Sequence, residues 1–290
     1  MTTPAKLKKG DYIALLAPSG PCLPSRLQLA VDAFKEFDLN PIIMPSCHAR
    51  NGYLAGSDQL RAKDIMDAFL NPNIMGIFAV RGGYGAQRLL PLLNYDSIAK
   101  NPKIFAGYSD TTALHTVLNQ FCNLVTYHSP MPATELYLPN IDQYTLDSFL
   151  GHIMEGHTPP ALSYTPLTPG NATGMLVGGN LSLLASSLGT PYEIKTQNKI
   201  LFIEEIQETP YRIDRLLLQL KLSGKLEECN GIILGDLLPE NTRTLSQAIK
   251  EILVPLGKPL GADLPCGHSL PTATLPLGSE VSMNEGTLIY

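Results

Sequence analysis

The sequence lacks the cysteine and histidine patterns of a disulfide-bonded or metal-binding protein. Its five cysteines are scattered and form no C-x-x-C pair, and its six histidines show neither H-E-x-x-H nor H-x₃-H spacing. A disulfide framework needs an even set of paired cysteines, and a zinc site needs closely spaced ligands. We therefore expect a protein of a reducing compartment that uses neither a metal nor another cofactor.

Long apolar runs and clusters of basic residues are also missing. The net charge is −5 and no basic run occurs, which argues against nucleic acid or an anionic membrane surface as a partner. The apolar stretch at residues 12–18 is too short for a signal peptide, and none approaches the roughly 20 residues of a membrane span. The sequence predicts a cytoplasmic protein.

The order of the predicted elements indicates an α/β protein with two domains. Residues 12–17 form a continuous apolar run, which is typical of a strand buried on both faces of a parallel sheet. Strands and amphipathic helices then alternate, which predicts a parallel-sheet α/β domain over residues 1–155. Residues 156–171 hold four prolines and show no helical period, so we predict a semi-rigid linker there.

The second half, residues 172–290, is predicted to form a separate domain. Strands are expected at residues 174–179, 199–203 and 231–235, and helices at residues 181–188, from Pro210 to Gly224, and at residues 245–253. The last ten residues are typical of a hairpin around residues 284–286.

Ser109 lies at a sharp turn between a predicted strand, residues 103–107, and a predicted helix. The helix is indicated by Leu114, Val117, Leu118 and Phe121, which fall on one face. A serine in this place has an exposed hydroxyl and a free N–H next to it, as in a nucleophile elbow. The ordinary alternative is a helix cap, and only the first glycine of G-x-S-x-G is present.

A glycine-rich segment, Arg81–Gly85, follows another predicted strand at residues 76–80. Ligands bind beyond the carboxyl ends of parallel strands, so we expect these glycines on the same edge of the sheet as Ser109. Their N–H groups could face a ligand there, although a tight turn is the simpler interpretation.

Two acids and several histidines could complete a serine-hydrolase site. Glu204 and Glu205 follow a predicted strand, where acids are usually solvated but can orient a catalytic histidine. His268 lies in a loop rich in glycine and proline and is the favoured base. His128 is the alternative base, whereas His115, in the helix after Ser109, is expected to pack or cap.

Taken in chain order, these features resemble the LD-carboxypeptidase family of serine peptidases, the muramoyltetrapeptide carboxypeptidases of bacterial cell-wall recycling. The resemblance covers nearly the whole chain. Its matching stretches are Leu15–Ser19, Gly52–Gly56, Arg81–Gly85, Gly107–Asp110, Val177–Leu181, Phe202–Glu205, Tyr211–Arg215, Gly267–His268 and Leu275–Gly278.

The resemblance implies a Ser–Glu–His triad split between an N-terminal α/β domain and a C-terminal α+β domain. By motif, Ser109 is the nucleophile, His268 the general base and Glu204 the residue that orients it, with Glu205 as the second choice. It also implies a homodimer.

The resemblance further implies an oxyanion hole formed by the backbone N–H groups of Gly83 and Asp110. The reaction expected from it is release of the terminal D-alanine from murein tetrapeptides during peptidoglycan recycling. The segment at residues 269–274 varies in the family and leaves specificity open.

The sequence leaves two alternatives to this function. Microcin C immunity peptidases carry the same triad and cleave an aminoacyl-nucleotide amide, but they generally have a longer loop, and no such insertion is evident here. A non-catalytic ligand-binding relative is the other alternative, against which the three intact triad residue types argue. The sequence does not identify the diamino residue before D-alanine, nor whether free, muramyl-linked or UDP-linked peptide is preferred.

Overall fold

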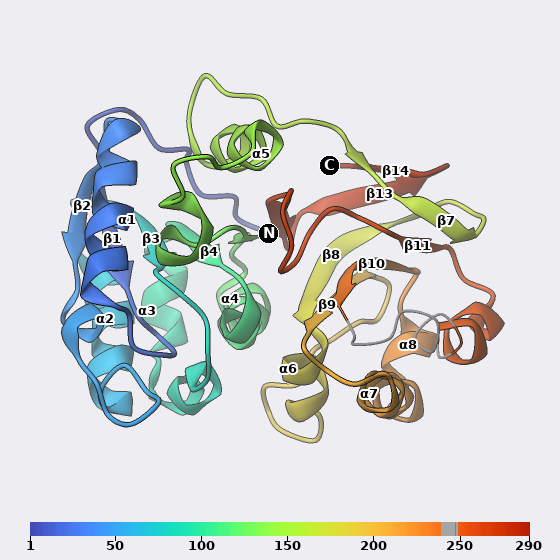
Figure 1. The fold of residues 1–290 in the computed structure, drawn as a ribbon. Helices are drawn as coiled ribbons and strands as arrows, with labels where there is room; N and C mark the ends of the chain where they lie inside the picture. Colours follow the sequence, from blue (N-terminus) through green and yellow to red (C-terminus); the bar gives the residue numbers. More distant parts are fainter. Residues whose placement is uncertain (239–246, 248) are drawn as a thin grey trace. The chain divides into compact units, whose positions relative to one another are not determined.

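The computed structural model describes residues 1–238, 247 and 249–290, and the chain divides into two compact units (Figure 1). The first unit comprises residues 1–160 and 274–276, and the second comprises residues 161–273 and 277–290. Within the described residues, no helix is both long enough and apolar enough to cross a membrane.

A six-stranded sheet in the order β12-β5-β4-β3-β1-β2 forms the centre of the first unit. Strands β1 to β5 pair in parallel, as the alternating pattern predicts. The strands are β1 (Tyr12–Leu16), β2 (Asn40–Ile43), β3 (Ile74–Ala79), β4 (Ile104–Gly107), β5 (Thr126–His128) and β12 (Leu275–Leu277).

Aromatic side chains show that helices cover both faces of this sheet. Phe78 of β3 packs 4.8 Å from the ring of Phe34 in α1 and 6.0 Å from that of Phe149 in α5. Phe105 of β4 stacks instead on Phe69 of α2, at 6.4 Å. Burial on both faces explains why these strands have continuous apolar runs. The α-helices are α1 (Pro24–Glu36), α2 (Asp58–Leu70), α3 (Tyr95–Ala99), α4 (Thr112–Cys122) and α5 (Gln143–Ile153).

The second unit contains a mixed eight-stranded sheet in the order β6-β14-β13-β8-β9-β10-β11-β7. Strands β8 to β11 run parallel, and the remaining pairings are antiparallel. These strands are β6 (Leu162–Ser163), β7 (Thr165–Thr168), β8 (Ala172–Asn180), β9 (Ile200–Ile206), β10 (Gly231–Leu238), β11 (Leu260–Ala262), β13 (Glu280–Asn284) and β14 (Thr287–Ile289).

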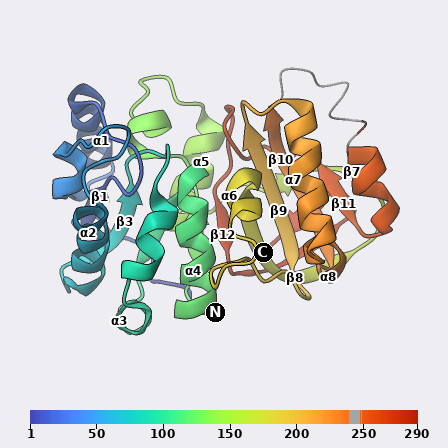
Figure 2. The same cartoon turned by 90° about the horizontal axis from the view of Figure 1, so that it is seen from below.

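Helices α6 (Leu181–Ser186) and α7 (Pro210–Leu222) pack together against the parallel strands of this sheet, and α8 (Lys225–Glu228) follows (Figure 2). Buried leucine and isoleucine side chains of α6, α7, β9 and β10 form one apolar core. It includes Leu184, Leu217 and Ile203. The predicted C-terminal hairpin is confirmed as β13 and β14.

Two sequence-based predictions differ from the structure. The predicted linker, residues 156–171, contains the strands β6 and β7 at the two edges of the second sheet, where a proline such as Pro166 is tolerated. Residues 274–276 belong to the first unit rather than to the C-terminal domain. After the glycine-rich segment, Ala86–Leu92 forms a 3₁₀ helix with Pro91 inside it.

Of the predicted helix over residues 245–253, residues 245, 246 and 248 lie outside the described residues, whereas residues 247 and 249–252 are helical, as predicted.

Acid should destabilise the first unit through two buried histidines. Burial lowers the pKa values of His115 and His152 to about 4, against about 6.5 when unfolded. The unfolded chain therefore binds these protons first, and stability is lost as the pH falls from about 6.5 toward 4. We expect each histidine to lower the free energy of unfolding by about 2 kcal/mol between pH 7.5 and pH 5.

Urea unfolding followed by circular dichroism at several pH values measures this effect. His115→Gln should remove about half of the loss, because one of the two buried imidazoles is gone. A wild-type free energy of unfolding that stays constant down to pH 5 contradicts the prediction.

Candidate active site

Ser109 adopts a left-handed backbone conformation, with φ of +63°, two residues after the end of strand β4. A non-glycine residue there stores about 1–3 kcal/mol of strain, so its surroundings must hold it in place. The hydroxyl of Thr111 donates to the carbonyl of Tyr108 at 2.9 Å and closes the turn. Strand, strained serine and helix α4 together have the geometry of a nucleophile elbow, and the serine is partly exposed.

The glycine-rich segment lies against Ser109, as expected from the shared edge of the sheet. A methyl group on Gly82 would lie 3.0 Å from both Cβ and Oγ of Ser109, so any side chain there would press on the serine. The next residue, Gly83, is exposed and has a φ of +122°, which favours glycine. Close approach of this backbone to the serine is what an oxyanion-binding loop requires.

A buried polar network fixes the far end of the glycine segment. The carboxylate of Asp110 accepts hydrogen bonds from the hydroxyl of Ser19 at 2.5 Å and from the N–H of Ala86 at 2.8 Å. Arg61, fully buried, donates to the carbonyl of Gly85 at 3.0 Å. Burial raises the pKa of Asp110, and these hydrogen bonds oppose that shift. Reasoning from the sequence did not assign these side chains, because no local pattern links residues so far apart in the chain.

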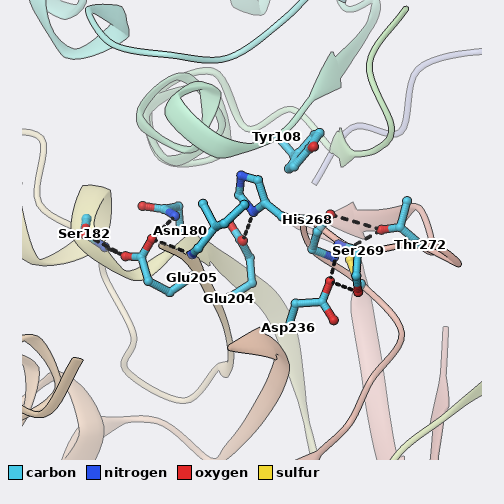
Figure 3. A network of polar contacts seen from close by, with 12 residues as sticks. Tyr108, Asn180, Ser182, Glu204, Glu205, Asp236, His268, Ser269 and Thr272 are labelled. Atoms are coloured by element: carbon cyan, nitrogen blue, oxygen red, sulfur yellow. Dashed lines mark hydrogen bonds and ion pairs between the residues drawn. The ribbon is translucent and has the colours of Figure 1, made fainter. Parts of the chain in front are cut away.

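In the second unit, Glu204 and His268 form a hydrogen-bonded pair (Figure 3). The Nδ1 of His268 lies 2.7 Å from Oε2 of Glu204, whose side chain is fully buried. Burial raises the pKa of Glu204, and the bond from His268 opposes that shift. A carboxylate at Nδ1 favours the tautomer with a lone pair on Nε2, which is the form a general base needs.

Glu205 has a different role, which separates the two acids that the sequence left as alternatives. Its carboxylate accepts hydrogen bonds from the side-chain amide of Asn180 at 2.8 Å and from the N–H and hydroxyl of Ser182 at 2.8 and 2.6 Å (Figure 3). These partners form the N-terminus of α6, where a negative charge is favourable. Glu205 therefore anchors a helix, and Glu204 holds the imidazole.

Both neighbours of His268 are held by side chains (Figure 3). Asp236 accepts hydrogen bonds from the N–H and hydroxyl of Ser269 at 2.7 and 2.6 Å. The hydroxyl of Thr272 accepts from the N–H of Gly267 at 3.1 Å. A methyl group on Gly267 would lie 2.7 Å from Cβ of Asp236, so this approach needs glycine. The histidine thus sits on a loop that is fixed on both sides.

A β-bulge in β10 explains how Asp236 reaches that loop. The pairing of β10 with β9 shifts register between Leu234 and Leu237, where β10 carries one extra residue. A bulge turns a side chain away from the regular alternation of the strand. Neighbouring strands therefore supply two carboxylates, Glu204 for the imidazole and Asp236 for the backbone beside it.

The other candidate histidines are buried in the first unit. The Nε2 of His115 lies 2.8 Å from the carbonyl of Gly107, consistent with the expected packing role. His128, on β5, pairs in register with Gly107 and is also buried. Among the described residues, no group of three or more His, Cys, Asp or Glu side chains is placed to hold a metal ion.

Both halves of the chain match the domains of one peptidase family. Residues 13–129 match the LD-carboxypeptidase N-terminal domain, and residues 173–283 match the LD-carboxypeptidase C-terminal domain. The probable murein peptide carboxypeptidase of Bacillus subtilis (strain 168) is 38% identical over 290 residues, which cover 97% of this chain and 91% of that protein.

Two further relatives differ in their described activities. The crystal structure of muramoyltetrapeptide carboxypeptidase from Oxalobacter formigenes matches with a TM-score of 0.85 and 30% identity, covering 96% of this chain and 97% of that one. The microcin C7 self-immunity protein MccF of Escherichia coli is 30% identical over 269 residues, which cover 80% of this chain and 77% of that protein.

These matches define a serine carboxypeptidase, which confirms the predicted enzyme class. They also confirm the predicted fold class, an N-terminal α/β domain followed by a C-terminal domain that combines helices with a mixed sheet. The chain belongs to the peptidase S66 family, the LD-carboxypeptidases.

The two neighbouring acids should respond differently to the same substitution. Glu204→Gln should lower kcat by about 10³- to 10⁴-fold with the fold retained, because the imidazole loses its orienting carboxylate. Glu205→Gln should instead cost about 1–3 kcal/mol of stability through the α6 terminus, with kcat close to that of the wild type. Steady-state kinetics and urea unfolding of both variants measure this. The reverse pattern would show that the roles are exchanged.

Asp236 should act on catalysis by positioning His268. Asp236→Ala should lower kcat by about 10–100-fold with little change in KM, because the loop carrying the base loses two hydrogen bonds. Asp236→Asn keeps an acceptor oxygen for Ser269 and should recover most of the activity. Kinetics of the two variants measure the difference, and equal kcat values for Asp236→Ala and wild type would contradict this role.

Proposed function

We propose that this enzyme is an LD-carboxypeptidase that releases the terminal D-alanine of murein tetrapeptides. The observation that carries the chemistry is the 2.7 Å bond between buried Glu204 and Nδ1 of His268, in a chain whose strained Ser109 faces a glycine-rich loop. The substrate class is supported by the similarity to the murein peptide carboxypeptidase of Bacillus subtilis.

In the proposed mechanism, Oγ of Ser109 attacks the carbonyl carbon of the bond between an L-centre and D-alanine. His268 takes the hydroxyl proton at Nε2, and Glu204 stabilises the imidazolium that forms. The tetrahedral intermediate collapses when the imidazolium protonates the leaving nitrogen, which frees D-alanine. Water, activated by the same imidazole, then hydrolyses the ester on Ser109 and restores the enzyme.

The negative charge on the tetrahedral intermediate is proposed to be met by the N–H groups of Gly83 and Asp110. The contact between Gly82 and Ser109 supports this assignment, because it brings the glycine backbone beside the nucleophile. The hydrogen bond from the N–H of Ala86 to the carboxylate of Asp110 also supports this assignment, because it fixes the backbone at the end of the glycine-rich segment. Loss of one such donor typically raises the barrier by about 3–4 kcal/mol.

Cleavage of an aminoacyl-nucleotide amide is the second candidate, favoured by the similarity to the self-immunity protein MccF. Both substrates contain an amide between an aminoacyl group and an anionic leaving group, so the proposed triad suits either. Cleavage of murein tetrapeptides is the preferred function, because the murein peptide carboxypeptidase is more similar to this chain than MccF is, at 38% against 30% identity.

We also propose that the enzyme acts in the cytoplasm, in peptidoglycan recycling, and as a homodimer. The five cysteines are all free, which suits a reducing compartment. The dimer follows from the family resemblance, and light scattering of the purified protein measures it.

A substrate panel tests the proposed function. Purified protein should release D-alanine from murein tetrapeptides, with lysine or diaminopimelate as the diamino residue, and should leave a D-alanyl-D-alanine terminus and an aminoacyl-sulfamoyl adenosine intact. Chromatography of the products measures each reaction. Ser109→Ala should abolish turnover, because no other nucleophile is proposed.

Other outcomes reassign the function or the site. Cleavage of the sulfamoyl adenosine alone favours the MccF-like activity. Unchanged activity in Ser109→Ala contradicts the nucleophile assignment. Loss of activity in His128→Ala, with His268→Ala active, would show that the base is His128.

A further inference from the structure

Arg81 is the first residue of the glycine-rich segment and lies two residues after the end of β3. Its Nη1 donates to the carbonyl of Pro21 at 3.1 Å. A methyl group on Gly20 would lie 3.4 Å from its Cζ, and one on Gly83 would lie 3.7 Å from its Nη2. The guanidinium therefore lies between the backbones of Gly20 and Gly83, beside the proposed oxyanion donor.

Arg81 differs from the other arginines near this loop in having no acidic partner. Arg61 and Arg88 both form ion pairs with Asp58. Among the described residues the guanidinium of Arg81 takes part in no ion pair, and it donates a hydrogen bond to the carbonyl of Pro21. Arginine stays charged at any accessible pH, and a partly buried cation without a counter-charge is unfavourable. An anion supplied by the substrate would provide that charge.

A carboxypeptidase substrate carries an anion at the required separation. Its terminal carboxylate is joined to the scissile carbonyl carbon through one nitrogen and one Cα, which places the two carbons less than about 4 Å apart. With the carbonyl oxygen at the N–H of Gly83, the carboxylate falls within reach of Nη2 of Arg81. Guanidinium groups bind carboxylates through two parallel hydrogen bonds, which also fixes orientation.

We propose that Arg81 binds the C-terminal carboxylate of the substrate and thereby restricts the enzyme to the terminal residue. This inference rests on the proposed function, because it places the scissile carbonyl at Ser109 and Gly83.

Two peptides that differ only at the terminus test this assignment: a murein tetrapeptide ending in D-alanine and the same peptide ending in D-alaninamide. Wild-type enzyme should prefer the acid by about 100-fold in kcat/KM. Arg81→Gln should lose about that factor on the acid and change little on the amide, so that the preference disappears. Arg81→Lys keeps the positive charge but loses the paired N–H donors of the guanidinium, so it should retain part of the preference for the acid.

Arg88→Gln is the matched control, since Arg88 already has an acidic partner, and it should keep the full preference. If Arg81 only braced the loop through Pro21, Arg81→Gln would slow both peptides equally, and this result would overturn the proposal. A preference unchanged in Arg81→Gln would overturn it as well.

A binding measurement separates this proposal from the proposed function. In a Ser109→Ala background, calorimetry should show tighter binding of the acid than of the amide, and Arg81→Gln should remove the difference. If the wild type cleaves neither peptide, the proposed function is wrong, and the calorimetric comparison still decides whether Arg81 binds a terminal carboxylate. Equal binding of the two peptides by the Ser109→Ala protein would overturn the assignment.

Discussion

The left-handed backbone of Ser109 is the constraint on which the chemistry-bearing edge of the first unit depends. A serine with φ of +63° is strained, and it persists only because its neighbours leave it no alternative. Thr111 closes the turn, and Gly82 lies close enough that even a methyl group would meet the serine. The strained turn places the serine beyond the end of β4 and against the backbone of the glycine-rich segment.

In the second unit, the central feature is a carboxylate that is buried within the sheet. Glu204 is fully buried on β9, where a charge without partners would be costly. The imidazole of His268 supplies the partner, and Asp236 and Thr272 fix the loop that carries it. Glu204 and His268 therefore stabilise each other, and the hydrogen bond proposed to orient the imidazole is also the contact that makes burial of Glu204 tolerable.

Much of the fold could be predicted from the sequence because its signals are local. Continuous apolar runs identified the parallel strands β1, β3 and β4, and helical periodicity identified α4. The stretch with four prolines was less informative, because proline marks an edge strand such as β7 as readily as a linker. The candidate positions Ser109, Glu204 and His268 were also recognisable, since each follows a predicted strand or lies in a predicted loop, but their roles came from the family resemblance. In the structure β9 runs on to Ile206 and includes Glu204.

The roles of the neighbouring side chains could not be predicted, because they depend on contacts between distant residues. Glu204 and Glu205 are adjacent and chemically identical, yet one faces His268 and the other faces the start of α6. Asp236 reaches Ser269 only through a bulge that its own strand does not reveal, and Arg61 meets Gly85 across 24 positions of sequence. The sequence by itself determined which elements form and which residue types stand at their ends. Tertiary structure alone decided which carboxylate orients the imidazole, because side-chain direction depends on strand register and local bulges, and these are set by pairing between segments far apart in the chain.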